Sequence, residues 1–196
     1  MGILEKFEVF EGEGARRYDR AVSRLSSLLY WHAIRDLKKM GVRGRYLEAG
    51  CGPGILAVKI VKEFGVEVVA FDLSESMVKI ARERARGENA GVDFRVGDVE
   101  NDYFGEFDVV YSTFSLHHWA NPEKGLKNLW RMVKPGGVLY ILDARKERFI
   151  GHGLGFSKFR SLFENLENVE IAEIRKRFPL MVSAVAVKGD LSRSNS

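Results

Sequence analysis

The sequence contains no glutamine and only one cysteine, Cys51, among its 196 residues. A single cysteine excludes an internal disulfide and is typical of a protein in a reducing cytoplasm. No apolar run approaches the roughly 20 residues that span a bilayer. The first residues, "MGILEKFEVFEGEG", carry charges throughout and have no apolar core of a signal peptide. These absences predict a soluble cytoplasmic protein.

The charge balance is mildly basic, with 31 Lys and Arg against 27 Asp and Glu. Basic residues are interleaved with acids, as in "RDLKKMGVRGR". This balance permits an acidic or nucleic-acid partner but does not require one. The lack of glutamine, together with abundant Glu, Lys and Arg, is a bias that fits proteins made by thermophiles.

Strand and helix patterns alternate along the chain without an internal repeat or a dividing linker. Apolar spacing and capping residues predict helices over 15–40, 55–64, 74–86, 122–133 and 156–166. Short apolar runs predict strands over 45–49, 66–72, 92–98, 107–113, 138–144, 169–178 and 180–189, with a turn over 134–137. Such an order predicts a parallel sheet covered by helices on both faces. Only Pro179 separates the last two strands, which should therefore pair as an antiparallel hairpin.

Three glycines follow the first predicted strand, in "YLEAGCGPGILA" over residues 46–57. Gly50, Gly52 and Gly54 lie where a strand turns into a helix, and glycine lets a ligand approach the backbone there. Ile55 stands where the dinucleotide-binding fingerprint has its third glycine, which disfavours a nicotinamide-dependent oxidoreductase. No Lys-Ser/Thr pair follows, so the turn is not a phosphate-binding P-loop. Alone, such a turn also fits a purely structural role.

Two acids end the next two predicted strands, Asp72 and Asp98. Ligands of open α/β sheets bind at the carboxyl ends of the strands. A carboxylate at Asp72 can accept both hydroxyls of a ribose, and one at Asp98 can accept an adenine amino group. Either acid alone could also be a helix cap or a turn residue. A glycine turn combined with both acids is a more specific pattern, and it indicates a nucleoside-binding site.

The segments "LEAGCGPG", "VVAFDLSESMVKIAR", "FRVGDVE" and "FDVVYSTFSLHHWANPEKGLKNLWRMVKPGGVLYI" resemble the class I S-adenosylmethionine-dependent methyltransferases. The likeness is strongest to the methyltransferase type 11 group, which includes quinone-biosynthesis enzymes, and it covers residues 45–143. It implies an α/β fold, a Rossmann-like seven-stranded sheet, mostly parallel with the last strand antiparallel, and helices on both faces. The expected organisation is one domain over 1–196, with a cofactor-covering helical segment (1–44), a catalytic core (45–189) and a flexible tail (190–196).

The resemblance implies that S-adenosylmethionine, with S-adenosylhomocysteine as product, is the cofactor. The implied cofactor-binding residues are Tyr18, Glu48, Gly50, Cys51, Gly52, Gly54, Asp72, Leu73, Met77, Asp98, Val99, Ser112 and Thr113. In this scheme the glycines frame the methionine part and Glu48 fixes its amino group, while Leu73 and Met77 pack on the adenine. Cys51 is interpreted as a packing residue of the loop and not as a nucleophile. No metal is expected.

The acceptor is predicted to lie near "SLHHW", where His117 and His118 are candidate bases for removing a proton. One of these histidines could instead cap a helix. No Asp/Asn-Pro-Pro-Tyr follows the fourth strand and no Pro-Cys is present, which disfavours methylation of nucleic-acid bases. Arg145, Lys146 and Arg148 could bind an acidic acceptor or form a solvated loop.

We therefore expect a methyltransferase whose acceptor is a small molecule, with no membrane partner. An RNA or protein methyltransferase of the same fold is the first alternative. The second is a non-catalytic subunit that keeps the cofactor pocket and activates a partner.

Overall fold

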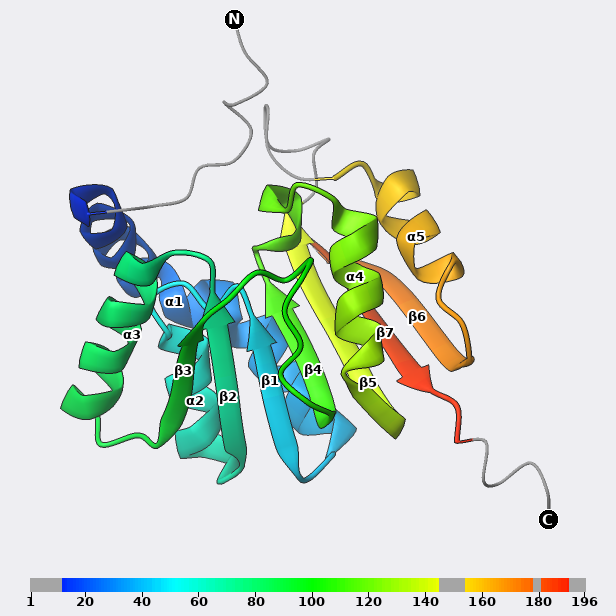
Figure 1. The fold of residues 1–196 in the computed structure, drawn as a ribbon, viewed down its shortest axis with the longest axis horizontal. Helices are drawn as coiled ribbons and strands as arrows, with labels where there is room; N and C mark the ends of the chain where they lie inside the picture. The colour runs from blue at the N-terminus through cyan, green and yellow to red at the C-terminus, as the bar shows by residue number, and fades with distance from the viewer. Residues whose placement is uncertain (1–11, 145–153, 178–180, 191–196) are drawn as a thin grey trace, which may run out of the picture.

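The computed structural model of the chain describes residues 12–144, 154–177 and 181–190. A single seven-stranded sheet runs through these residues in the order β3-β2-β1-β4-β5-β7-β6 (Figure 1). The strands are β1 (Arg45–Ala49), β2 (Glu67–Asp72), β3 (Val92–Val96), β4 (Phe107–Thr113), β5 (Val133–Ala144), β6 (Val169–Arg177) and β7 (Met181–Lys188). Strands β1 to β5 pair in parallel, and β7 runs antiparallel to both β5 and β6. The predicted fold class is confirmed, including its antiparallel last strand.

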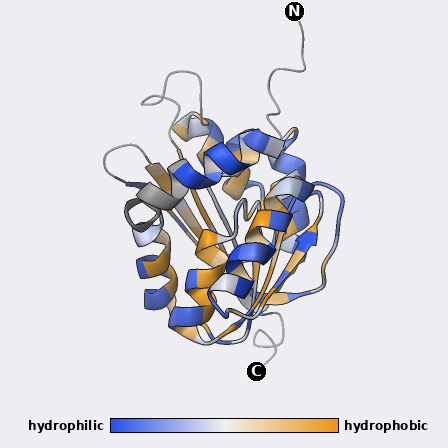
Figure 2. Cartoon of the chain, turned by 90° about the vertical axis from the view of Figure 1, so that its left-hand side faces the viewer, coloured by the Kyte–Doolittle hydropathy of each residue, from blue (hydrophilic) through white to orange (hydrophobic). Residues whose placement is uncertain are grey.

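Helices cover both faces of the sheet (Figure 1). They are α1 (Gly12–Met40), α2 (Ile55–Phe64), α3 (Glu75–Gly87), α4 (Pro122–Arg131) and α5 (Phe156–Glu164). Helices α1, α2 and α3 bury their apolar residues with one face of the sheet, and α4 and α5 with the other. The helices in Figure 2 carry both hydrophilic and hydrophobic residues, as expected of helices that bury one side. None of the helices in the described ranges is long and apolar enough to cross a membrane.

Most predicted boundaries lie within a few residues of the observed ones, and two differences concern turns. Strand β3 ends at Val96, so Asp98 lies in the turn after the strand and not at its last residue. Strand β5 begins at Val133 and includes the "KPGG" stretch that the sequence predicts as a separate turn. Gly136 has a φ of 74°, and the pairing of β4 with β5 shifts between Phe107 and Val109, so the strand absorbs the turn as an irregularity.

Helix α1 is fixed to the rest of the molecule at two places. Near its carboxyl end, the buried Asp36 forms an ion pair with Arg177 of β6 and accepts a hydrogen bond from the Tyr140 hydroxyl of β5. Near its amino end, Asp19 forms an ion pair with Arg84 of α3. These contacts hold α1 across one face of the sheet. The predicted tail from residue 191 onward and Pro179 lie outside the described residues.

Candidate functional site

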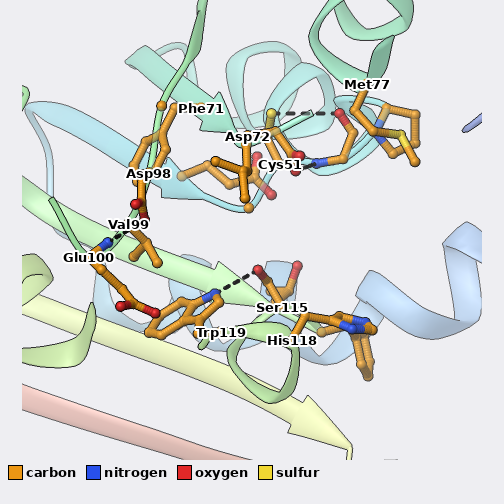
Figure 3. A pocket seen from close by; sticks show the side chains of 18 of the residues that line it. Cys51, Phe71, Asp72, Met77, Asp98, Val99, Glu100, Ser115, His118 and Trp119 are labelled. Carbon is orange, nitrogen blue, oxygen red and sulfur yellow. Dashed lines mark hydrogen bonds between the residues drawn. The ribbon is translucent and has the colours of Figure 1, made fainter. Parts of the chain in front are cut away.

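A cavity lies where the carboxyl ends of β1, β2 and β4 meet the turn after β3 (Figure 3). Eleven of the residues singled out in the sequence line it: Glu48, Gly50, Cys51, Gly52, Asp72, Leu73, Met77, Asp98, Val99, Thr113 and His118. The parallel order of β3, β2, β1 and β4 brings these segments together, because each strand delivers its following loop to the same edge. The structure therefore gathers most of the predicted residues around one space.

Three other predicted residues do not line the cavity. Gly54 is the amino-terminal cap of α2, and a Cβ there would lie 2.7 Å from both the Ala81 Cβ and the Phe94 ring. The absence of a side chain at Gly54 thus serves helix packing. Ser112 is fully buried and donates its hydroxyl to the Ala49 carbonyl at 2.8 Å, so it links β4 to β1. The third residue, His117, points elsewhere and is described below.

Two further parts of the sequence prediction lie outside what the structure describes. Tyr18 belongs to α1, but its side chain is outside the described residues. The basic residues proposed for an acidic acceptor, Arg145, Lys146 and Arg148, also lie outside them.

The glycine turn is attached to the end of β2 by backbone hydrogen bonds. The amides of Gly50 and Cys51 both donate to the Phe71 carbonyl, at 2.9 and 3.0 Å. The Gly52 amide donates to Asp72 Oδ2 at 2.8 Å. Gly50 and Gly52 have φ values of 69° and 50°, which only glycine adopts readily. The turn therefore presents backbone to the cavity, and its shape depends on Asp72.

Both predicted acids also organise local turns. Asp72 Oδ1 accepts from the Ser74 amide at 3.0 Å, while Asp98 Oδ1 accepts from the Glu100 amide at 2.8 Å. The other oxygen of each acid also accepts a hydrogen bond, from the Gly52 amide at Asp72 and from the Asn101 side chain at Asp98, but a carboxylate oxygen has two lone pairs and can accept more than one bond. Hence the two interpretations of the acids, turn residue and ligand acceptor, are compatible with one another.

Glu48 is a buried acid on the cavity wall, with 2% of its surface exposed. Burial raises its pKa to about 8, with the negative charge of Asp72 adding to the rise and a 3.2 Å hydrogen bond from the Tyr111 hydroxyl opposing it. Burial likewise raises the pKa of the Cys51 thiol well above its usual value. Cys51 is therefore a thiol and not a thiolate at neutral pH, in agreement with its interpretation as a packing residue.

The two histidines have different surroundings. They belong to a short 3-10 helix, η2 (Leu116–His118), that follows β4. His118 lines the cavity, whereas His117 Nδ1 lies 2.6 Å from Oδ1 of the buried Asp143. The two imidazole rings lie against each other with centroids 4.0 Å apart and planes inclined by 41°. Of the two candidate bases, only His118 is placed toward a ligand in the cavity.

Sequence reasoning missed much of the cavity wall: Tyr30, Pro53, Phe71, Gly97, Glu100, Phe114, Ser115, Trp119 and Ala120. Four of these are aromatic, and their apolar neighbours make them look like ordinary core residues. Ser115 contacts the glycine turn and accepts a 2.9 Å hydrogen bond from the Trp119 indole (Figure 3). Ser115 and Trp119 are the ends of the "SLHHW" stretch that the sequence places near the acceptor, but only the structure shows that their own side chains line the cavity.

The known proteins that this chain resembles in sequence are methyltransferases. Residues 47–141 match the model of a family described as "Methyltransferase domain". Ubiquinone biosynthesis O-methyltransferase of Xanthomonas oryzae is 35% identical over 100 residues, which are 50% of this chain and 41% of that protein. Phosphoethanolamine N-methyltransferase 1 of Arabidopsis thaliana is 34% identical over 140 residues, 68% of this chain and 28% of that protein. The aligned segment thus spans less than half of either relative.

A crystal structure of a SAM dependent methyltransferase from Aquifex aeolicus has the same fold, with a TM-score of 0.75 and 21% identity. That likeness covers 91% of this chain and 98% of the other. The sequence match, the strand order and the cavity agree on one family, the class I S-adenosylmethionine-dependent methyltransferases.

Proposed function

We propose that this protein transfers the methyl group of S-adenosylmethionine to a hydroxyl group of a small aromatic acceptor. The observation that carries the proposal is the composition of the single cavity described above. One part of its wall is the glycine turn with Asp72, and another part is aromatic and contains His118. The family assigns the cofactor to the first part, which leaves the second for the acceptor.

The residues of the glycine turn fit the cofactor. The amides of Gly50 and Gly52 are used within the protein, by the Phe71 carbonyl and by Asp72, so the turn offers the cofactor close approach to a backbone without side chains, and Asp72 offers carboxylate lone pairs beside it. Glu48 is a buried acid that accepts hydrogen bonds from the Tyr111 hydroxyl and the Ala57 backbone, and its place on the cavity wall lets it receive an ammonium group as well. When bound, S-adenosylmethionine supplies an electrophilic methyl group on a sulfonium.

The aromatic wall favours a neutral planar acceptor. Tyr30, Phe114 and Trp119 line the cavity, and no Lys or Arg does so among the described residues. A phosphate or carboxylate therefore has no cationic partner in this part of the structure, whereas an aromatic ring has faces to stack on. The O-methyltransferase relatives support a hydroxyl as the nucleophile. The protein's main tasks are then to align this oxygen with the methyl group and to take its proton, and His118 is placed for the second task.

A methyl-transfer assay with catechol and phosphoethanolamine as alternative acceptors tests this proposal. We expect a methylated catechol product, detected by mass spectrometry. We also expect His118→Gln to lower kcat at least about 100-fold, because general-base catalysis contributes that much. His32→Gln is the matched control, since His32 lies outside the cavity beside Trp31 and Arg35. Methylation of phosphoethanolamine alone, or full activity of the His118 variant, would refute the proposal.

The alternatives drawn from the sequence give different results in the same experiment. An RNA or protein methyltransferase would methylate cellular RNA or protein and leave catechol unchanged. A non-catalytic subunit would show activity only with a co-purified partner. We propose further that the chain works as one domain in the cytoplasm. Its described helices include none that would cross a membrane.

Binding of S-adenosylhomocysteine should depend on pH through Glu48. The pKa of Glu48 is about 8 in the free protein, and an ammonium group beside the carboxylate would lower it. Binding then releases a proton, so affinity should increase as the pH rises from 6 to about 8, by up to about tenfold per pH unit. Calorimetry in two buffers of different ionisation enthalpy measures the proton release. Glu48→Gln should abolish this release, and an unchanged release in the variant would exclude Glu48 as its source.

A further inference from the structure

We propose that Asp143 is a positioning residue of the acceptor site, which acts through His117 to hold His118 on the cavity wall. This inference rests on the proposed function for its catalytic consequence. Its structural part, the pairing of Asp143 with His117, stands independently. Asp143 does not line the cavity and therefore touches neither cofactor nor acceptor in this scheme.

Asp143 ties the end of β5 to the turn after β4. Its side chain is fully buried, and both of its carboxylate oxygens are hydrogen-bonded. Oδ2 accepts from the backbone amide of His117 at 2.9 Å. Oδ1 lies 2.6 Å from His117 Nδ1 and accepts from the Ala144 amide at 2.7 Å. A buried carboxylate thus holds both the backbone and the ring of one histidine.

This pairing fixes the hydrogen positions of His117. A carboxylate accepts hydrogen bonds and does not donate them, so in the proposed pair His117 Nδ1 carries the hydrogen. The ring orientation is then set, and so is the tautomer when the imidazole is neutral, with Nε2 as the basic nitrogen. Because the His118 ring packs against the His117 ring with centroids 4.0 Å apart, a fixed His117 also restricts where His118 can lie.

The turn that carries His118 has a backbone conformation that needs such support. Phe114 has a φ of 54°, a left-handed value that costs energy in any residue with a side chain. The Phe114 amide donates to the Leu142 carbonyl of β5 at 2.8 Å, one residue before Asp143. The buried Leu116 anchors the turn in the core. Asp143 therefore completes a set of contacts that prevents the turn from relaxing away from the cavity.

The decisive variant is Asp143→Asn. An amide has the size of a carboxylate, but its NH2 group would face one of the three hydrogen-bond donors that Asp143 accepts from. In wild-type protein, nitrogen NMR of labelled histidine should show His117 with its hydrogen on Nδ1. In the variant, the fraction of His117 with its hydrogen on Nδ1 should fall, because a neutral amide holds that hydrogen less strongly than a carboxylate does. The kcat with catechol should fall at least 30-fold, on the order of a lost hydrogen bond to a charged group. The affinity for S-adenosylhomocysteine should change less than about threefold, because the cofactor part of the wall is separate.

Asp93→Asn is the matched control, because Asp93 is an exposed carboxylate of β3 outside the cavity. If Asp143→Asn does not fold, the comparison of His117→Asn with His117→Ala replaces it. An asparagine amide can still donate to Asp143, so His117→Asn should retain about tenfold more activity than His117→Ala.

Three results would overturn the proposal. The first is a wild-type His117 with its hydrogen on Nε2. The second is an Asp143→Asn protein with unchanged kcat, and the third is an Asp143→Asn protein that loses cofactor affinity and activity together. Failure of the wild-type protein to bind S-adenosylhomocysteine would instead reject the proposed function, and the NMR result would still decide whether Asp143 holds His117.

Discussion

Asp72→Ala is expected to lower the affinity for S-adenosylhomocysteine at least about 100-fold, because the substitution removes two functions at once. The carboxylate is the predicted acceptor for the ribose hydroxyls, and hydrogen bonds to a charged group contribute about 1.5–3 kcal/mol each. The same carboxylate holds the glycine turn through Gly52 and the start of α3 through Ser74. Calorimetric titration of S-adenosylmethionine and S-adenosylhomocysteine into both proteins measures the effect.

Two controls separate the loss of a cofactor contact from a general loss of folded protein. Asp93→Ala removes an exposed carboxylate from the neighbouring strand, whose partner is Arg95, and should bind like the wild type. NAD should not bind to either protein, since Ile55 replaces the third glycine of the dinucleotide fingerprint. Binding of NAD, or tight binding of S-adenosylhomocysteine by Asp72→Ala, would contradict the assignment of the site.

The sequence predicts the order and approximate bounds of the helices and strands well, because their apolar patterns are regular and capping or turn residues separate them. Ser74 caps α3 through the Met77 amide, and Asn121 with Pro122 opens α4, as their sequence positions indicate. Glycine and acid positions are also predictable, since parallel strands deliver their ends to one edge. Where the prediction differs, the "KPGG" stretch keeps its turn-like conformation as an unpaired irregularity within β5, because the residues on either side of it, Val133 and Val138, pair with β4.

The details of the cavity depend on contacts between distant segments, which periodicity does not encode. The sequence does not distinguish His117 from His118, because only the fold brings Asp143 beside one of them. Gly54 resembles Gly50 and Gly52 in the motif, yet it packs against Ala81 and Phe94 instead of facing the cavity. Such residues differ through their neighbours in space, and the neighbours come from other strands and helices.

Gly50→Ala is expected to abolish measurable cofactor binding, because Gly50 lies against Ser115. A Cβ at Gly50 would be 1.9 Å from the Ser115 Oγ and 2.5 Å from its Cβ. Either the glycine turn or the turn after β4 must therefore move. The left-handed φ of 69° adds strain, so we expect a loss of about 2–4 kcal/mol in the free energy of unfolding. Denaturant unfolding and titration with S-adenosylhomocysteine measure the two effects.

Gly52→Ala is the matched control, because Gly52 also has a positive φ but a Cβ there would meet nothing within 4 Å. The free energy of unfolding of Gly52→Ala should fall by the backbone strain alone, about 1–2 kcal/mol. Adding Ser115→Gly to Gly50→Ala removes both atoms that the new methyl group would strike. The double variant should therefore regain most of the difference in free energy of unfolding between Gly50→Ala and Gly52→Ala. If the double variant is no better than Gly50→Ala, contact with Ser115 is not the reason for a glycine at this position. A recovery of binding would show that the shape of the cofactor turn is set by the same segment that carries His118 and Trp119.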